Sequence, residues 1–184
     1  NREINLDTFM QAFTPDVLSQ IKYLLFCGHH GDSIYATDFL KIVNYVKQHS
    51  DTHIRLITNG SYKTTDWWAE LASVLNARDT INFSVDGYNQ ASNNLYRIGS
   101  DWTSIMMGMQ TMAQKSPAFV YWATIVFAFN QDHLKDIEQQ ARDIGCDGLQ
   151  LTYSTKFGSK YGGYGIQDVL EPRLEFISST HRYE

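Results

Sequence analysis

Apolar residues recur along the chain in two patterns that alternate with each other. The first pattern is a short run rich in β-branched and aromatic residues, mostly apolar and without strict alternation. Such runs predict strands that are covered on both faces, as in a parallel sheet. Five of them occur, at residues 21–26, 53–58, 80–86, 119–129 and 148–153.

Between these runs, apolar residues recur every three or four positions, which is the spacing of one face of a helix. Helices are therefore predicted within residues 35–49, 64–75, 101–114 and 130–145, with a further one within residues 4–13. Thr65 is the predicted N-cap of the 64–75 helix, and Asn130 caps the 130–145 helix, which ends at Gly145. In the 64–75 helix we expect the buried face to consist of Trp67, Leu71 and Val74.

Strands and helices alternate at intervals of about 30 residues, which is typical of βαβ units joined by right-handed crossovers. The predicted fold is therefore α/β, a parallel-stranded partial (β/α) barrel of the TIM type. The helix within residues 4–13 has no strand before it, so we expect the barrel to lack its first strand. Residues 1–155 form this predicted core. Residues 156–184 are a glycine- and tyrosine-rich extension, expected as a loop that leads to a further domain in a longer protein.

Composition narrows the range of partners. The chain has 184 residues, 43% of them hydrophobic, which is enough for the core of one ordinary domain. Its net charge of −5 argues against nucleic acid or an anionic membrane as the main partner. The sequence has no apolar run long enough to span a bilayer and no leader of the secretory type. Cys27 and Cys146 lie far apart in the sequence, which indicates neither a disulfide framework nor a CxxC metal site, so a reducing, cytoplasmic compartment is expected.

Small polar residues follow three consecutive predicted strands, in the segments CGHHGDS (27–33), TNG (58–60) and SVDG (84–87). Asn130 follows the fourth predicted strand. In open α/β sheets and in βα barrels, ligands bind at the carboxyl ends of the strands. Loops favour these residue types in any case, so it is their repetition after successive strands that indicates a binding site.

The segment CGHHGDS allows more than one interpretation. His29 and His30 are adjacent, so on an extended backbone their side chains point to opposite sides, which disfavours a shared metal ion. Gly28 and Gly31 favour a sharply bent backbone that exposes its N–H and C=O groups to a ligand. Asp32 either accepts hydrogen bonds from a ligand ammonium group or serves as the N-cap of the following segment.

The later strand ends carry further candidates, each with a structural alternative. Ser84 and Asp86 lie two residues apart on an extended backbone and could hold the hydroxyls of a ribose, or they are a buried serine and a turn aspartate. Arg97 could bind a carboxylate in bidentate fashion or form a surface ion pair. Asn59, in TNG, is either a ligand contact or part of an ordinary turn.

The order of these segments resembles the radical S-adenosylmethionine (radical SAM) superfamily. In that family, successive strands end in Gly-Gly-Glu-Pro, in Thr-Asn-Gly and in Ser-x-Asp-Gly, followed by an arginine and by a strand ending near an asparagine, here Asn130. The similarity covers residues 21 to about 153 and is greatest for the peptide-modifying and sulfatase-maturating branch. Each motif alone is weak, but four in the right order are fairly specific.

The resemblance implies a role for the first turn. His30-Gly31-Asp32-Ser33 occupies the Gly-Gly-Glu-Pro position, whose backbone edge pairs with the methionine amino group of the cofactor in the family. The match is degenerate, because histidine, aspartate and serine replace the first glycine, the glutamate and the proline.

The resemblance also implies cofactor contacts at the later strands. Asn59 matches the asparagine of Thr-Asn-Gly, and Ser84 and Asp86 match residues that lie near the cofactor ribose. Arg97 matches an arginine close to the methionine carboxylate, and Leu151 is expected near the adenine.

The family's defining motif, CxxxCxxC after the first strand, is absent from the 184 residues. In the family these cysteines bind a [4Fe–4S] cluster that cleaves S-adenosylmethionine to a 5′-deoxyadenosyl radical, which abstracts hydrogen from the substrate. We expect the motif to lie upstream rather than to have been lost, so this segment by itself is inactive. The implied partners are S-adenosylmethionine, a reductant protein and an unidentified substrate, which in this branch is a peptide or protein.

Two alternatives remain at the level of sequence. One is a metal-dependent TIM-barrel-type enzyme that uses His29, His30 and Asp32. The other is a cluster-less module that binds a nucleoside or a peptide without turnover. The first predicts loss of a bound metal when His30 is replaced, and the radical SAM interpretation does not.

Overall fold

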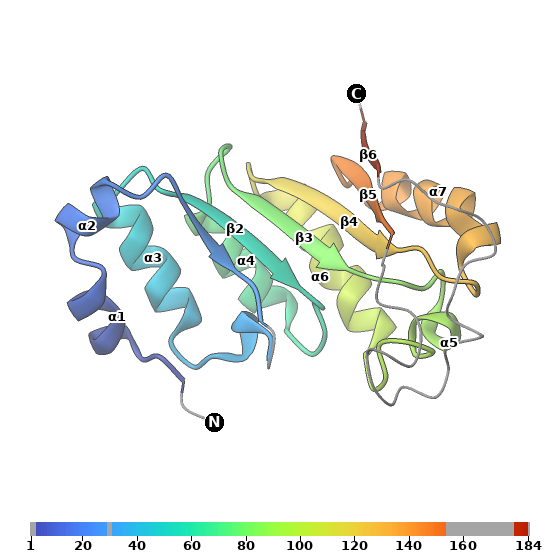
Figure 1. The fold of residues 1–184 in the computed structure, drawn as a ribbon, viewed down its shortest axis with the longest axis horizontal. Coiled ribbons are helices and arrows are strands. Elements are labelled where there is room, and N and C mark those ends of the chain that lie inside the picture. Colours follow the sequence, from blue (N-terminus) through green and yellow to red (C-terminus); the bar gives the residue numbers. More distant parts are fainter. Residues whose placement is uncertain (1–2, 29–30, 154–178, 184) are drawn as a thin grey trace.

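The computed structural model describes residues 3–28, 31–153 and 179–183, and it contains a six-stranded sheet in the order β1-β2-β3-β4-β5-β6 (Figure 1). The first five strands run parallel to one another, and β6 runs antiparallel to β5. Their bounds are Tyr23–Phe26, His53–Thr58, Thr80–Ser84, Phe119–Ile125, Gly148–Thr152 and Ser179–Arg182. All five predicted strands are confirmed, although β3 and β4 end earlier than their apolar runs. The predicted α/β class with parallel strands is also confirmed.

The helices that follow β1, β2, β3 and β4 connect successive parallel strands, and those after β2 and β3 lie behind the sheet in Figure 1. All five predicted helices are present, and two short helices and two 3-10 turns accompany them. The α-helices are α1 (Leu6–Ala12), α2 (Pro15–Ser19), α3 (Phe39–His49), α4 (Thr65–Val74), α5 (Gln90–Asn93), α6 (Trp102–Lys115) and α7 (Leu134–Ile144), and the 3-10 turns are η1 (Ser33–Tyr35) and η2 (Gln131–His133). None of the helices in the described part of the chain has the length and apolar character that a membrane crossing requires.

Helix α4 begins one residue before the predicted position. Thr64, not Thr65, is the N-cap, and its hydroxyl accepts a hydrogen bond from the backbone N–H of Trp67. Trp68 is the fully buried tryptophan, whereas Trp67 is only partly buried. Room for the Trp68 indole exists because α6 carries Gly108 beside it, where a Cβ atom would lie 2.4 Å from the indole nitrogen. Two adjacent tryptophans cannot be ranked by spacing alone, so this remote contact decides which one is buried.

The two faces of the sheet differ. One face packs against the helices, and its alternate residues form the core, namely Ile54, Leu56, Ile81, Phe83, Val120, Trp122, Leu149 and Leu151. On the opposite face, Tyr23, Leu25 and Ile57 are 47%, 49% and 38% exposed. The expectation that strands are covered on both faces is therefore wrong for β1 and β2 in the described part of the chain. The reason is that the crossover helices lie on one side of the sheet only, as in the wall of a barrel (Figure 1).

Two aspartates fasten the amino ends of the strands. Asp79 precedes β3 and accepts a hydrogen bond from the backbone N–H of Ile54 in β2 at 2.7 Å. Asp147 precedes β5 and accepts one from the N–H of Val120 in β4, also at 2.7 Å. Each carboxylate therefore ties its own strand to the strand before it.

Strand β6 was not predicted, because residues 156–184 were expected to form a loop. It pairs with β5 and is followed by Tyr183, whose backbone N–H donates to Asp147 O at 2.8 Å. The Tyr183 hydroxyl donates to Glu138 O on α7, and the Arg142 guanidinium lies 3.9 Å from the centre of its ring. These contacts hold the strand against the edge of the sheet.

Candidate functional site

Asp32 joins the loops that follow β1 and β2. Its Oδ2 accepts hydrogen bonds from the hydroxyl of Thr58 at 2.8 Å and from the backbone N–H of Asn59 at 2.6 Å. Its Oδ1 accepts from the N–H of Ile34 at 3.3 Å, so Asp32 is the N-cap of η1. Of the two sequence interpretations, the cap is confirmed, and binding of a ligand ammonium group by Asp32 stays a prediction.

The turn after β1 is tightly folded, as its glycines predict. A Cβ atom added to Gly28 would lie 1.4 Å from the carbonyl oxygen of Gly31, so only glycine fits this approach of backbone to backbone. His29 and His30 lie outside the described residues. Among the described residues, no three histidine, cysteine, aspartate or glutamate side chains are grouped as metal ligands would be.

Asn59 lies at the end of β2 with one half of its amide engaged. Its Oδ1 accepts hydrogen bonds from the Tyr35 hydroxyl at 3.0 Å and from the backbone N–H of Ser61 at 2.9 Å. Its Nδ2 makes no hydrogen bond to a described residue. Burial of Tyr35, aided by the negative charge of Asp32, raises the pKa of that tyrosine, so its hydroxyl stays a hydrogen-bond donor at neutral pH.

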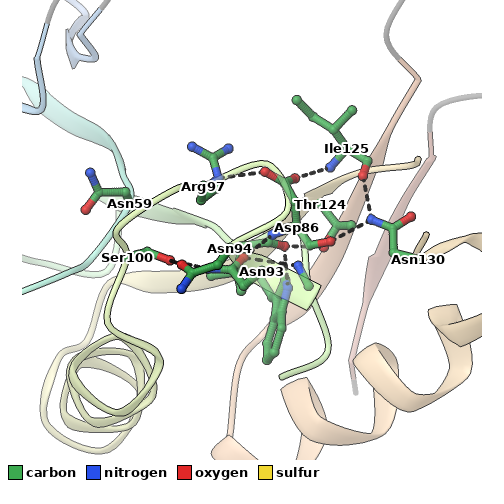
Figure 2. A network of polar contacts seen from close by, with 12 residues as sticks. Asn59, Asp86, Asn93, Asn94, Arg97, Ser100, Thr124, Ile125 and Asn130 are labelled. Atoms are coloured by element: carbon green, nitrogen blue, oxygen red, sulfur yellow. Dashed lines mark hydrogen bonds and ion pairs between the residues drawn. The ribbon is translucent and has the colours of Figure 1, made fainter. Parts of the chain in front are cut away.

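Asp86 is completely buried just beyond the end of β3 and is the centre of the network in Figure 2. Its Oδ2 accepts from Nε of Arg97 and its Oδ1 from the backbone N–H of Ile125, each at 2.6 Å. Burial raises the pKa of this carboxyl, and the charge of Arg97 and the Ile125 hydrogen bond oppose that rise. The predicted turn aspartate is therefore an anchor that joins β3, β4 and the loop after β3.

Arg97 and Ser84 retain unused hydrogen-bonding groups. Arg97 is held through Nε, while its terminal amino groups point away from Asp86 and make no hydrogen bond to a described residue (Figure 2). The arginine side chain is 24% exposed. Ser84, the last residue of β3, is half-buried, and its hydroxyl likewise has no hydrogen-bond partner among the described residues.

Asn130 and Leu151 are occupied by the fold itself. The Asn130 amide donates to Asp86 O at 2.7 Å and to Ile125 O at 2.8 Å, and its Oδ1 accepts from the N–H of Phe127. The prediction that Asn130 caps the 130–145 helix is wrong, because its side chain makes no cap hydrogen bond and α7 begins at Leu134. Leu151 is 7% exposed and lies in the core on the helix side of the sheet. Cofactor contact by either residue stays a prediction.

One central residue of the site escaped the sequence analysis. Asn93 is completely buried, and its Oδ1 accepts from the backbone N–H groups of Asp86 and Gly87 at 3.0 and 3.1 Å. A Cβ atom on Gly87 would lie 2.2 Å from the Asn93 nitrogen, so glycine is required there. The available signal was the capping pattern of Asn89 and Ser92, which places the one-turn helix α5 directly after SVDG.

The strand ends therefore bring the candidate residues together in two groups. Asp32, Asp86 and Asn130 hold the loops in place with their side chains fully engaged. The unengaged groups are the Nδ2 of Asn59, the hydroxyl of Ser84 and the terminal amino groups of Arg97. A fixed guanidinium with two free amino groups suits a carboxylate, and a hydroxyl with an amide suits the hydroxyls of a ligand. This arrangement is equipped to bind a small polar molecule.

Comparisons with known proteins were made by sequence and by structure. No family model matches the chain, and no curated protein matches its sequence. Solved structures do match. For anSMEcpe with bound AdoMet the TM-score is 0.65 at 14% identity, covering 91% of this chain and 48% of that one. For TYW1 with a lysine-pyruvate adduct bound it is 0.61 at 11% identity, covering 91% and 58%.

A third match is SuiB from Streptococcus suis bound to S-adenosylmethionine, with a TM-score of 0.57 at 9% identity, covering 79% of this chain and 31% of that one. All three are radical SAM enzymes. The chain has the radical SAM core fold. It spans less than two thirds of each of these structures, so the likeness concerns the core and not the whole enzymes. The expected partial (β/α) barrel of this family is thereby confirmed as the fold of the described sheet.

Radical SAM enzymes hold an iron–sulfur cluster beside the cofactor. The cysteines of this chain do not supply the three thiolate ligands that such a cluster needs. The sequence contains two cysteines and no CxxxCxxC motif. Cys27 follows β1 and is exposed, whereas Cys146 is buried before β5 at the opposite end of the sheet. Burial raises the pKa of Cys146 to about 12, which keeps it a protonated thiol rather than a thiolate ligand.

Proposed function

We propose that this chain is the S-adenosylmethionine-binding core of a radical SAM enzyme. The observation that carries the proposal is Arg97, which follows α5 and is held beside the end of β3 by Asp86. Its Nε donates to the buried Asp86 at 2.6 Å, and its guanidinium lies 5.6 Å from the centre of the Tyr96 ring, while its terminal amino groups make no hydrogen bond to a described residue. In this fold the carboxyl ends of the strands are where a ligand binds, and a pre-oriented guanidinium there suits the methionine carboxylate.

The other strand-end residues receive roles that match their free groups. The hydroxyl of Ser84 and the Nδ2 of Asn59 would hydrogen-bond the ribose or the methionine moiety. The turn that includes His30, Gly31 and Asp32 would face the methionine amino group through its backbone.

Three further residues support this pocket in the proposal. Asp86 and Asn130 position it without free side-chain donors of their own. Leu151 is assigned to the adenine side of the site through its place in β5.

When bound, S-adenosylmethionine serves radical SAM enzymes as the source of a 5′-deoxyadenosyl radical for hydrogen abstraction. The 184 residues offer no three-cysteine ligand set for the cluster that this chemistry requires. The proposal therefore gives this chain cofactor binding and positioning, and no redox step of its own. For the complete enzyme it includes a reductant protein.

A peptide or protein substrate is part of the proposal. Its support comes from two of the matching enzymes, since SuiB is known bound to the precursor peptide SuiA and anSMEcpe bound to the Kp18Cys peptide together with AdoMet.

The test is an NMR titration of the 15N-labelled 184-residue chain with S-adenosylmethionine and, separately, with 5′-deoxyadenosine, which lacks the methionine carboxylate. We expect signals of Asn59 and Ser84 to shift with both ligands, and the signal of Arg97 to shift with S-adenosylmethionine. Arg97→Gln should weaken binding of S-adenosylmethionine about tenfold or more, because a charged hydrogen bond is lost. Binding of 5′-deoxyadenosine should be unchanged.

The control is Arg78→Gln, which removes an exposed arginine before β3 at the other end of the sheet and should alter neither titration. The proposal fails if the wild-type chain gives no response at the three strand-end residues. It also fails if Arg97→Gln weakens both ligands equally, because the arginine would then not recognise the carboxylate.

A further inference from the structure

The open face of the sheet is the face that the helices do not cover. Its middle carries three uncharged polar side chains at positions where a buried parallel sheet normally has Val, Ile or Leu. Asn82 lies in β3 directly opposite Tyr121 in β4, and Tyr121 lies opposite Gly148 in β5. Gln150 is two residues farther along β5, opposite Ala123. The alternation of each strand therefore puts all three polar side chains on the face that the helices do not cover.

Asn82 and Gln150 are joined across the intervening strand. Asn82 Nδ2 donates to Gln150 Oε1 at 2.6 Å. The small side chain of Ala123 lies in β4 between them and leaves room for the two amides to meet. This bond uses one end of each amide. Within the described part of the chain, the Oδ1 of Asn82 is buried without a hydrogen-bond partner, and the Nε2 of Gln150 makes no hydrogen bond.

Tyr121 adds a third unpaired group. Its side chain is only 3% exposed, yet it lies outside the core cluster that Val120 and Trp122 enter on the helix side. Its hydroxyl makes no hydrogen bond to a described residue. In this group Asn82 Oδ1 is the atom that is also shut off from solvent, and the Tyr121 hydroxyl and the Gln150 Nε2 add hydrogen-bonding capacity that no described residue uses.

A fold gains nothing from such a group by itself. A buried acceptor such as Asn82 Oδ1 that is left unsatisfied destabilises the fold, and two apolar residues in place of the amide pair would be nearly neutral or stabilising. We propose that Asn82, Tyr121 and Gln150 form a subsite that binds an uncharged amide group of the substrate. This inference rests on the proposed function and adds the chemistry of the group that the open face recognises.

An amide fits because its two ends complement the free ends of the pair. The ligand N–H meets the acceptor Oδ1 of Asn82, and the ligand C=O meets the donor Nε2 of Gln150 or the Tyr121 hydroxyl. Within the described part of the chain, this group of three side chains contains no charge that could pair with a charged ligand. The arginines of the strands on either side, Arg55 in β2 and Arg182 in β6, lie over aromatic rings, those of Tyr23 and Phe119.

The subsite lies below the proposed cofactor position on the same strand. Asn82 precedes Ser84 by two residues, which is about 7 Å along an extended strand, with both side chains on the same face. A substrate amide held at Asn82 would thus lie about 7 Å, the length of two residues of extended peptide, from a group that contacts the strand ends.

The subsite is tested with small probes on the 15N-labelled 184-residue chain. N-methylacetamide represents a peptide-backbone amide, acetamide a side-chain carboxamide, and acetate a charged ligand of similar size. We expect the side-chain NH2 signals of Asn82 and Gln150 to shift with the amides and to be unaffected by acetate. A stronger response to N-methylacetamide identifies a backbone amide as the natural ligand, and a stronger response to acetamide identifies a carboxamide.

Three variants accompany the titration. Tyr121→Phe keeps the ring and should weaken amide binding about fivefold. The double variant Asn82→Leu with Gln150→Leu should remove the amide response, followed on the backbone signals of β4, without lowering the midpoint of thermal unfolding. Gln139→Leu, on the exposed surface of α7, is the matched control and should change nothing.

The inference is overturned if amides and acetate give equal shifts, or if Tyr121→Phe binds the amide probes as the wild type does. It is also overturned if the double variant lowers the unfolding midpoint and keeps the amide response, because the pair would then be structural. The amide response does not involve S-adenosylmethionine. Failure of the cofactor titration and failure of the subsite are therefore separate results.

Discussion

Each end of β3 carries a buried aspartate paired with a cation, but the two cations lie in different surroundings. Asp79 before the strand and Asp86 after it are both completely buried. Asp79 accepts the backbone N–H of Ile54 in β2 and Asp86 that of Ile125 in β4, so each ties β3 to a neighbouring strand. Each is also paired with a cation, at 2.5 Å in the first case and 2.6 Å in the second.

The difference lies in the cations. Lys47, the partner of Asp79, is 8% exposed and also donates to Thr52 O at 3.0 Å, so its ammonium is enclosed by the protein. Arg97, the partner of Asp86, is 24% exposed and is held through one nitrogen only. The ammonium of a lysine is a compact charge that the carboxylate neutralises. The planar guanidinium of an arginine can donate to a protein carboxylate on one side and to a ligand on the other. One carboxylate thus closes the amino end of the strand, and the other, in the proposed function, prepares the carboxyl end for a ligand.

The comparison predicts its largest effect at the closed end. Asp79→Asn leaves the Lys47 ammonium buried without a counter-ion, which should lower the free energy of unfolding by about 3–5 kcal/mol. Urea denaturation measures this loss. Asp51→Asn, at an exposed position before β2, is the control and should be close to neutral. A loss at Asp79 no larger than that of the control would show that the ion pair is not needed.

At the open end the same replacement should cost less. Asp86→Asn should lower the free energy of unfolding by about 1–3 kcal/mol, because water reaches the guanidinium of Arg97 and one acceptor oxygen is retained. Its larger consequence is for binding, since the arginine loses its anchor. The S-adenosylmethionine titration should weaken as it does in Arg97→Gln. An Asp86→Asn chain that is destabilised but binds normally would contradict the positioning role of this carboxylate.

The smallest expected effect is a pH dependence of the free energy of unfolding, which comes from groups at the amino ends of the strands. Burial raises the pKa of Cys146 from 9.0 to about 12 and that of Tyr183 from 10.0 to about 12. Both groups are neutral when protonated, and the unfolded chain loses these protons at lower pH than the folded chain. The free energy of unfolding should therefore be constant below pH 9 and fall above it, by about 1.4 kcal/mol per pH unit from the cysteine.

Urea denaturation at a series of pH values measures this slope. Cys146→Ala should reduce it above pH 9 and leave the curve flat below. An unchanged slope in the variant would assign the alkaline loss to other groups.

The regular elements of the fold could be predicted because their signals are local. Each parallel strand is an apolar run, and each long helix repeats at its own spacing, so neither requires knowledge of the rest of the chain. Strand β6 has no such signal, since the segment Ser179–Arg182 is polar and is stabilised by pairing with β5 and by the contacts of Tyr183 with α7. The exchange of Trp67 for Trp68 has the same origin, because Gly108 lies on another helix.

For the site, the sequence could predict where the polar residues lie but not which of their hydrogen-bonding groups the fold already uses. Once parallel strands are predicted, their carboxyl ends must lie together, which correctly grouped Asp32, Asn59, Ser84 and Arg97 at one edge. Which polar groups remain free depends on partners far along the chain. The Asn130 amide, for example, reaches Asp86 across 44 residues. Local spacing favoured a helix cap for Asn130, whereas the folded chain uses it to join two loops.

The direction of β6 has a practical consequence. Because this strand returns toward the amino ends of its neighbours, Tyr183 lies beside Asp147, on the side of the molecule away from Arg97 and Asn59. An affinity tag or a fluorescent label attached after that tyrosine would point away from the carboxyl ends of the parallel strands. The chain can therefore be immobilised on a sensor surface by this end with the proposed binding edge turned toward the solution.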